Sequence, residues 1–282
     1  MSGKIYKIKI VRGHKPRRGE PISNSYIFFV HTLNILKDLN KILPQSFEKY
    51  KEDLLKQHRE QISILDQRGK KELAKYLSFL KNTTRKNFRA GTLNFTNRKL
   101  VNILKEQDKL FLYSIRFNMF IREMSLAYLI TEFEQFLGRA LSITFEKFPN
   151  RLMTAQKNVS YEEVLSSKQL DDLKAKIIDR EVNGVIAQDI DEITKYLKDK
   201  FGFDMSSSSK YGEFKERFYR RNIVIHNNCY PDEKYRKRSG YKGPSKRMSI
   251  TQGYLTISIN LFRNFALVFK NSLEKRTGIK IG

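Results

Sequence analysis

The stretch LAYLITEFEQFLGRALSITF, residues 126–145, is the most apolar part of the chain and decides the fold class. Its apolar residues recur at intervals of three and four positions, which is typical of a helix that buries a broad face. Charged residues of the kind that a bilayer core excludes interrupt it: Glu132, Glu134 and Arg139. We therefore expect a buried helix over residues 111–148, ended by Pro149, and neither a membrane span nor a membrane partner.

Helical spacing continues on both sides of this stretch. Further helices are expected at residues 44–80 with a break near Gly69, 161–180, 188–200, 210–226, and 261–274 with Ser258 or Asn260 as its cap. The first thirty residues instead hold two short apolar runs, 5–11 and 26–30, which predict a small β-hairpin. The expected fold class is mainly α: a helical bundle with an N-terminal extension that contains a short β-hairpin and a long helical hairpin.

The composition points to a polyanionic partner. The 282 residues include 55 Lys and Arg against 30 Asp and Glu, a formal net charge of +25. The single cysteine, Cys229, excludes an internal disulfide and a cysteine zinc site, which favours a reducing compartment. The N-terminus lacks the apolar core of a signal peptide, so we expect a cytoplasmic protein.

The informative segment is KYGEFKERFYRRNIVIHNN, residues 210–228. At about 100° per residue, one narrow sector of this helix contains Phe214, Phe218, Arg221 and Ile225. A guanidinium in an apolar stripe is costly unless it is compensated. Arg221 must therefore pair with a carboxylate, lie at an interface, or line a cleft where an anion binds.

His226 adds a group that can move protons. It lies four residues after Asn222, so the two side chains are neighbours on one flank of the helix, beside Lys215 and Tyr219. His226 also falls near the expected end of the helix, where the helix dipole favours imidazolium. It is therefore a candidate general acid or base near neutral pH.

The segment Arg221-Asn222-Ile-Val-Ile-His226 resembles the signature of the HEPN superfamily of ribonucleases, in which an arginine and a polar residue precede a histidine. The order of elements is similar too: a helix like that at residues 131–137 precedes the motif helix, and a final helix follows it. The resemblance covers about residues 112–275. We accordingly expect a HEPN-like catalytic domain at 111–282 and a basic N-terminal region at 1–110 that serves recognition or partner binding.

The resemblance implies a metal-independent endoribonuclease without a cofactor, which attacks RNA through its 2′-OH and acts as a toxin or antiviral defence effector. It also implies a homodimer through the motif helix and a possible antitoxin or regulatory partner. His226 would move protons, Arg221 would hold the phosphate, and Asn222 would orient one of these groups. By similarity Glu134 is the supporting acid, although helical arithmetic does not separate it from Glu132. Arg220 also precedes His226 at an allowed spacing, but it lies outside the apolar sector.

RNA contacts are expected next to this motif. An acid-free basic run with two tyrosines occupies residues 234–247, and its glycines and proline predict a loop rather than a helix. The predicted RNA-binding residues are Lys215, Tyr219, Arg220, Lys234, Arg236, Lys237 and Arg238.

Two other functions are compatible with the same sequence. The first is a non-catalytic RNA-binding or adaptor protein that uses a HEPN-like scaffold. The second is a metal nuclease built on the acidic segment 162–204, which we disfavour because its carboxylates have the spacing of a helix surface and form no metal-ligand motif.

Overall fold

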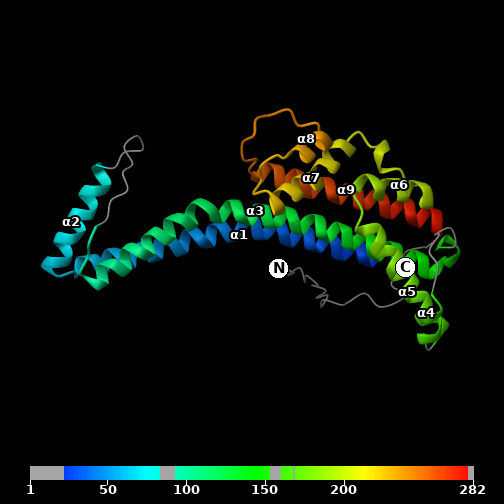
Figure 1. The fold of residues 1–282 in the computed structure, drawn as a ribbon, viewed down its shortest axis with the longest axis horizontal. Helices are drawn as coiled ribbons and strands as arrows, with labels where there is room; N and C mark the ends of the chain where they lie inside the picture. Colours follow the sequence, from blue (N-terminus) through cyan, green and yellow to red (C-terminus); the bar gives the residue numbers. More distant parts are fainter. Residues whose placement is uncertain (1–21, 83–92, 153–159, 168, 279–282) are drawn as a thin grey trace, which may run out of the picture. The chain divides into compact units, whose positions relative to one another are not determined.

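The computed structural model of the protein describes residues 22–82, 93–152, 160–167 and 169–278. All the secondary-structure elements among these residues are helices, and none is a strand (Figure 1). Their packing divides into two compact units: residues 38–124 form the smaller unit, and the described parts of 1–37 and 125–282 form the larger. This division falls inside two helices. The boundary expected at residue 110 stays a prediction.

The helices occupy most of the described chain. They are α1 (Ile22–Ser63), α2 (Gln67–Asn82), α3 (Arg98–Lys147), α4 (Tyr161–Ser166), α5 (Leu170–Ile186), α6 (Ile190–Phe201), α7 (Tyr211–His226), α8 (Glu233–Ser239) and α9 (Gln252–Thr277), with short 3-10 turns at Pro149–Leu152 and Met205–Ser207. The mainly α prediction is confirmed for the described residues.

The strand expected at residues 26–30 is wrong, because this run belongs to α1. Its aromatic residues are buried by helix packing: Phe29 stacks on Phe136 with ring centroids 5.4 Å apart, and Tyr26 meets Phe136 edge-on at 6.1 Å. A short apolar run therefore marks one face of a helix here. The other expected strand, residues 5–11, lies outside the described residues.

Helix α3 supplies the centre of the larger unit. It begins at Arg98, earlier than the expected residue 111. Most apolar residues of its segment 126–145 are buried as predicted, although Tyr128 is 49% exposed. The ring of Phe133 lies 6.0 Å from Phe29 of α1, 5.3 Å from Phe214 of α7 and 5.1 Å from Phe262 of α9. One aromatic cluster thus joins four helices, and α7 and α9 both lie along α3 in Figure 1.

Local caps explain where several of these helices end. Asp189 caps α6 by accepting a hydrogen bond from the backbone N–H of Asp191, and Gly202 ends the helix in the left-handed region. Helix α9 begins earlier than expected, because Thr251 caps it and Ser258 lies inside it, bonded to the carbonyl of Tyr254. The correction to α9 concerns where the helix begins and not whether it exists.

The smaller unit contains the second half of α1, all of α2 and the first half of α3. The break after α1 falls at residues 64–66, because Asp66 accepts a hydrogen bond from the N–H of Gly69 at 2.7 Å and caps α2. The helix expected to start at Pro44 starts at Ile22 and runs through the proline. His58 is buried and bonds to Glu106 at 2.8 Å.

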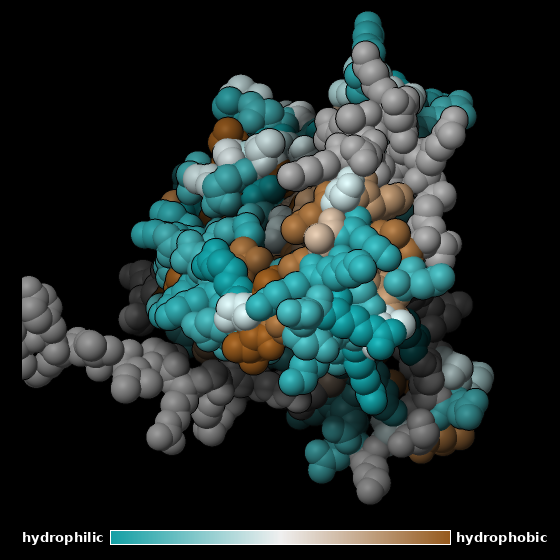
Figure 2. Space-filling model, turned by 90° about the vertical axis from the view of Figure 1, so that its left-hand side faces the viewer, coloured by the Kyte–Doolittle hydropathy of each residue, from teal (hydrophilic) through white to brown (hydrophobic). Residues whose placement is uncertain are grey.

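Hydrophilic residues predominate on the face drawn in Figure 2, where hydrophobic residues form small separate patches. Within the described residues, none of the helices combines the length and the apolar composition needed to cross a membrane.

Candidate active site

The motif helix α7 covers Tyr211–His226, as the sequence predicts. Burial decreases along its apolar sector: Phe214 and Phe218 are buried, Arg221 is partly exposed, and Ile225 is 52% exposed. The helix thus leaves the core as it approaches its C-terminal end. Arg221 lies at the border between core and surface, and His226 lies beyond it in solvent.

Arg221 is paired with Glu134 of α3. Its Nη2 donates a hydrogen bond of 2.7 Å to Oε1 of Glu134, and both side chains are mostly shielded. Glu132 faces elsewhere, with Oε2 at 4.0 Å from Nη2 of Arg139. The sequence left the choice between Glu132 and Glu134 open. In the structure it is Glu134 that contacts Arg221.

This pair does not use the full hydrogen-bonding capacity of the arginine. The buried Nε of Arg221 has no hydrogen-bond partner in the part of the chain that the structure describes. Burial raises the pKa of the Glu134 carboxyl, and the nearby Arg221 guanidinium opposes that rise. The Arg221 side chain nevertheless keeps 23% of its surface exposed, and a half-desolvated guanidinium of this kind is well suited to receive an oxyanion.

His226 is the last residue of α7 and is exposed, while Asn222 lies one turn earlier and is half-buried. A tight turn follows, in which Asn228 and Cys229 have φ values of 48° and 65°. The N–H of Cys229 donates to the carbonyl of Ile223 at 2.9 Å, and its own carbonyl accepts from the N–H of Met248 at 2.9 Å. These bonds fix the helix end that carries His226.

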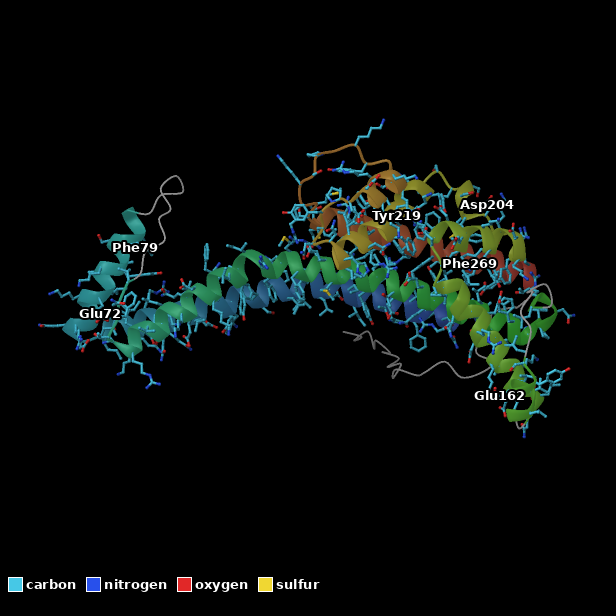
Figure 3. All side chains as sticks on the ribbon, in the orientation of Figure 1. Glu72, Phe79, Glu162, Asp204, Tyr219 and Phe269 are labelled. Carbon is cyan, nitrogen blue, oxygen red and sulfur yellow. The ribbon has the colours of Figure 1, made fainter. Side chains whose placement is uncertain are left out.

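The predicted RNA-binding residues of α7 are engaged within the fold. Lys215 pairs with Asp191 at 2.8 Å, and the hydroxyl of buried Tyr219, labelled in Figure 3, donates to the same carboxylate at 2.8 Å. Although partial burial acts to raise it, the pKa of Asp191 is lowered, because these groups donate to its ionised form. Arg238 of α8 lies 5.7 Å from the Tyr219 ring and pairs with Asp189.

Arg220 is also buried, and it belongs to a cluster around Glu216. The Glu216 carboxylate accepts hydrogen bonds from the hydroxyls of Tyr235 and Tyr254, both at 2.6 Å, and from Arg220 at 2.9 Å and Arg217 at 3.0 Å. Burial acts to raise the pKa of Glu216, but these donors hold it below its usual range. The cluster joins α7, α8 and α9.

Sequence reasoning missed three acids that pair with these cations: Glu216, Asp189 and Asp191. Glu216 stands four residues before Arg220, a spacing that indicates an ion pair on a helix. Asp189 and Asp191 have no comparable signal, because they lie far along the chain from their partners in a segment rich in acids.

The basic run after the motif is a helix in its first half, so the expected loop is wrong for residues 233–239. Asp232 caps α8 by accepting from the N–H of Tyr235 at 2.7 Å, and Gly240 ends it in the left-handed region. Lys234 and Lys237 are exposed on α8. Arg236 turns back instead, donating to the carbonyl of Gly243 at 2.7 Å and to Ser245 at 2.9 Å.

Within the described residues, no group of three or more His, Cys, Asp or Glu side chains is arranged to hold a metal ion. Comparisons of the chain with protein-family models, with characterised proteins and with solved structures find no match.

Proposed function

We propose that the protein is a HEPN-type endoribonuclease that cleaves RNA without a metal ion. The observation that carries this proposal is the contact between Arg221 of the motif helix and Glu134 of the preceding core helix, with His226 exposed at the end of the motif helix. An anion-binding guanidinium and a titratable imidazole are the groups that phosphodiester cleavage needs.

In the proposed reaction the 2′-oxygen of a ribose attacks the adjacent phosphorus. The O2′–P bond forms and the O5′–P bond breaks, which leaves a 2′,3′-cyclic phosphate and a 5′-hydroxyl. His226 takes the proton of the 2′-hydroxyl or gives a proton to the departing 5′-oxygen. Arg221 stabilises the charge that develops on the phosphate, Asn222 orients one of these groups, and Glu134 positions Arg221.

We further propose that the active form is a homodimer through α7. Arg221 and His226 are five residues apart, or about 140° around a regular helix, so one helix does not easily aim both at the same phosphate. A second copy supplies the missing group and a second histidine. The exposed apolar residues Ile225 and Tyr230 flank His226 and provide surface for such a contact.

The same resemblance supports a role as a toxin or antiviral defence effector in the cytoplasm. An RNA-cleaving enzyme of this kind endangers the cell that makes it, so an antitoxin or another regulatory protein is the partner that this role requires.

The proposal is tested by incubating total cellular RNA with the wild type, His226→Ala and Arg221→Ala in EDTA, and by mapping the product ends. We expect cyclic phosphate and 5′-hydroxyl ends from the wild type and no cleavage by either variant. His31→Ala and Arg116→Ala change the same residue types outside the site and should cleave normally.

Full activity in either motif variant, or complete loss of wild-type activity in EDTA, would contradict the proposed mechanism. RNA that is bound but never cut would support the alternative, a non-catalytic RNA-binding or adaptor protein. The exposed lysines that follow the motif helix are compatible with this alternative as well.

A further inference from the structure

Two sets of cations around the motif helix differ in whether a carboxylate contacts them. In the first set every side chain contacts a carboxylate: Lys215, Arg217, Arg220, Arg221 and Arg238. In the second set the side chains are exposed and form no ion pair with any residue that the structure describes: Lys234, Lys237, Lys242 and Lys246. Among these nine residues, only the second set offers charge that no carboxylate compensates.

The free lysines all lie on one ordered segment, residues 234–246, which we call the lysine segment. Lys234 and Lys237 are three residues apart on α8 and therefore share one face of it. Arg236 holds the following residues against α8 through Gly243 and Ser245, and the ring of Tyr241 packs 5.8 Å from that of Tyr235. The backbone that carries these charges is thus fixed before any ligand binds.

This segment starts and finishes beside the proposed site. It follows the turn after His226, and beyond its end the N–H of Met248 bonds to the carbonyl of Cys229 in that same turn. Figure 3 shows side chains of this segment extending away from the ribbon. A polyanion that lies along the segment therefore passes close to His226.

We propose that the lysine segment binds the phosphate backbone of the RNA, and that Lys215, Tyr219, Arg220 and Arg238 do not. This inference rests on the proposed function for the identity of the ligand. Lysines are depleted in protein–protein interfaces, whereas they are common contacts for phosphates. The paired set is unsuitable, because a phosphate that displaced Asp191 or Glu216 would leave a carboxylate uncompensated beside it.

The test measures RNA binding in the uncleaving His226→Ala background, with a labelled single-stranded RNA oligonucleotide over a series of KCl concentrations. The variant replaces Lys234, Lys237, Lys242 and Lys246 with Gln. For single strands the slope of log K against log[salt] is about 0.7 per phosphate contact, so four lost contacts should reduce the slope by about 3.

A matched control replaces four exposed lysines elsewhere in the larger unit with Gln, which changes the net charge equally: Lys147, Lys176, Lys195 and Lys275. We expect its slope to stay close to that of the parent. Thermal unfolding should be the same for both quadruple variants and the parent, because all eight side chains are exposed.

An unchanged slope in the lysine-segment variant would overturn the inference, and so would an equal reduction in the control. Restoring His226 in each variant separates this result from the proposed function. If the wild type cuts no RNA but the slope falls only in the lysine-segment variant, the binding surface stands and the catalytic proposal fails. If the wild type cuts RNA and the slope is unchanged, only the inference about the lysines fails.

Discussion

Arg220 and Arg221 are adjacent in the sequence but belong to two different charged clusters. Arg220 contacts Glu216, which accepts four hydrogen bonds from residues of α7, α8 and α9. Arg221 contacts Glu134 through a single hydrogen bond and keeps a buried Nε without a partner among the described residues. The carboxylate of the first cluster is fully used, whereas the arginine of the second keeps an unused donor.

The pKa values of Glu216 and Glu134 show the same difference between the two clusters. The donors around Glu216 outweigh its burial and lower its pKa, whereas burial outweighs the single guanidinium at Glu134 and raises its pKa. A saturated charge is typical of a structural cluster, and an incompletely compensated one is typical of a functional site. The comparison predicts that substitutions in the first cluster affect stability and those in the second affect cleavage.

The largest expected effect is that of Glu216→Gln on stability. The substitution leaves Arg217 and Arg220 buried without a full counter-charge, and we expect the free energy of unfolding to fall by about 3 to 5 kcal/mol. Urea unfolding measures this change. Glu213→Gln, which alters an exposed pair with Lys210, is the control and should change the same quantity by less than about 1 kcal/mol. A similar small change in both variants would break the comparison.

The next largest effect is that of Arg221→Lys on cleavage. Lysine keeps the charge but loses the planar fork of donors, so we expect the cleavage rate to fall by about 10²-fold or more with little change in the unfolding temperature. Arg220→Lys should show the reverse, with a lower unfolding temperature and near-normal cleavage by the folded protein. If the two variants behaved alike, the two clusters would not have separate roles.

A smaller effect concerns the pH dependence of stability. Because folding lowers the pKa of Glu216, its ionised form stabilises the protein above the unfolded pKa of about 4.5, and this stabilisation is lost as the pH falls through the lower folded value. The difference in unfolding free energy between wild type and Glu216→Gln should therefore shrink in acid.

The ionisation of Glu134 should change the stability of the protein with pH in the opposite direction. Its folded pKa is raised, so the stability gained from its protonated form is fully present below about pH 4.5 and is lost as the pH rises through the higher folded value. Relative to Glu134→Gln, the wild type should become less stable over that rise. Denaturant titrations at a series of pH values measure how the unfolding free energy of the wild type, relative to each variant, depends on pH. If this dependence had the same sign for Glu216→Gln and Glu134→Gln, the two carboxylates would not differ in the way described.

The smallest effect is that of Glu134→Gln on stability at neutral pH. The amide oxygen still accepts the hydrogen bond from Arg221, and the cost of burying a carboxylate disappears, so the unfolding free energy should change by less than about 1 kcal/mol. Cleavage should fall, but less than in Arg221→Lys, because Glu134 positions the arginine and does not contact the phosphate. A loss of stability as large as that of Glu216→Gln would show that Glu134 is structural.

Much of the helical architecture follows from residue spacing. The apolar periodicity of residues 126–145 predicts the core helix, and the periodicity of residues 210–226 predicts the motif helix almost to the residue. The run at 26–30 misled because a few apolar residues suit a strand or a buried helix equally. Helix α8 was missed because the glycines and the proline of the basic run, which predict a loop, all lie after the helix, whereas its cap Asp232 and its terminal Gly240 carry the helix signal.

The candidate site was predictable only in part, because its contacts join helices that are distant in the sequence. Helical arithmetic places Arg221 in an apolar sector and so requires a partner, but it does not select Glu134 over Glu132, because that choice depends on how two helices cross. The partners of Lys215, Tyr219 and Arg238 depend in the same way on where α6 lies. Contacts between distant segments are set by packing, which spacing along one helix does not encode.

The backbone bond between Cys229 and Met248 has an evolutionary consequence. It brings the two ends of the intervening segment together, so the residues after Gly240 form a loop whose closure is already secured. Each doubling of the length of such a loop costs only about 0.6 kcal/mol. Insertions and exchanges of charge in this stretch can therefore accumulate at little cost to folding, while the turn that holds the end of the motif helix stays in place.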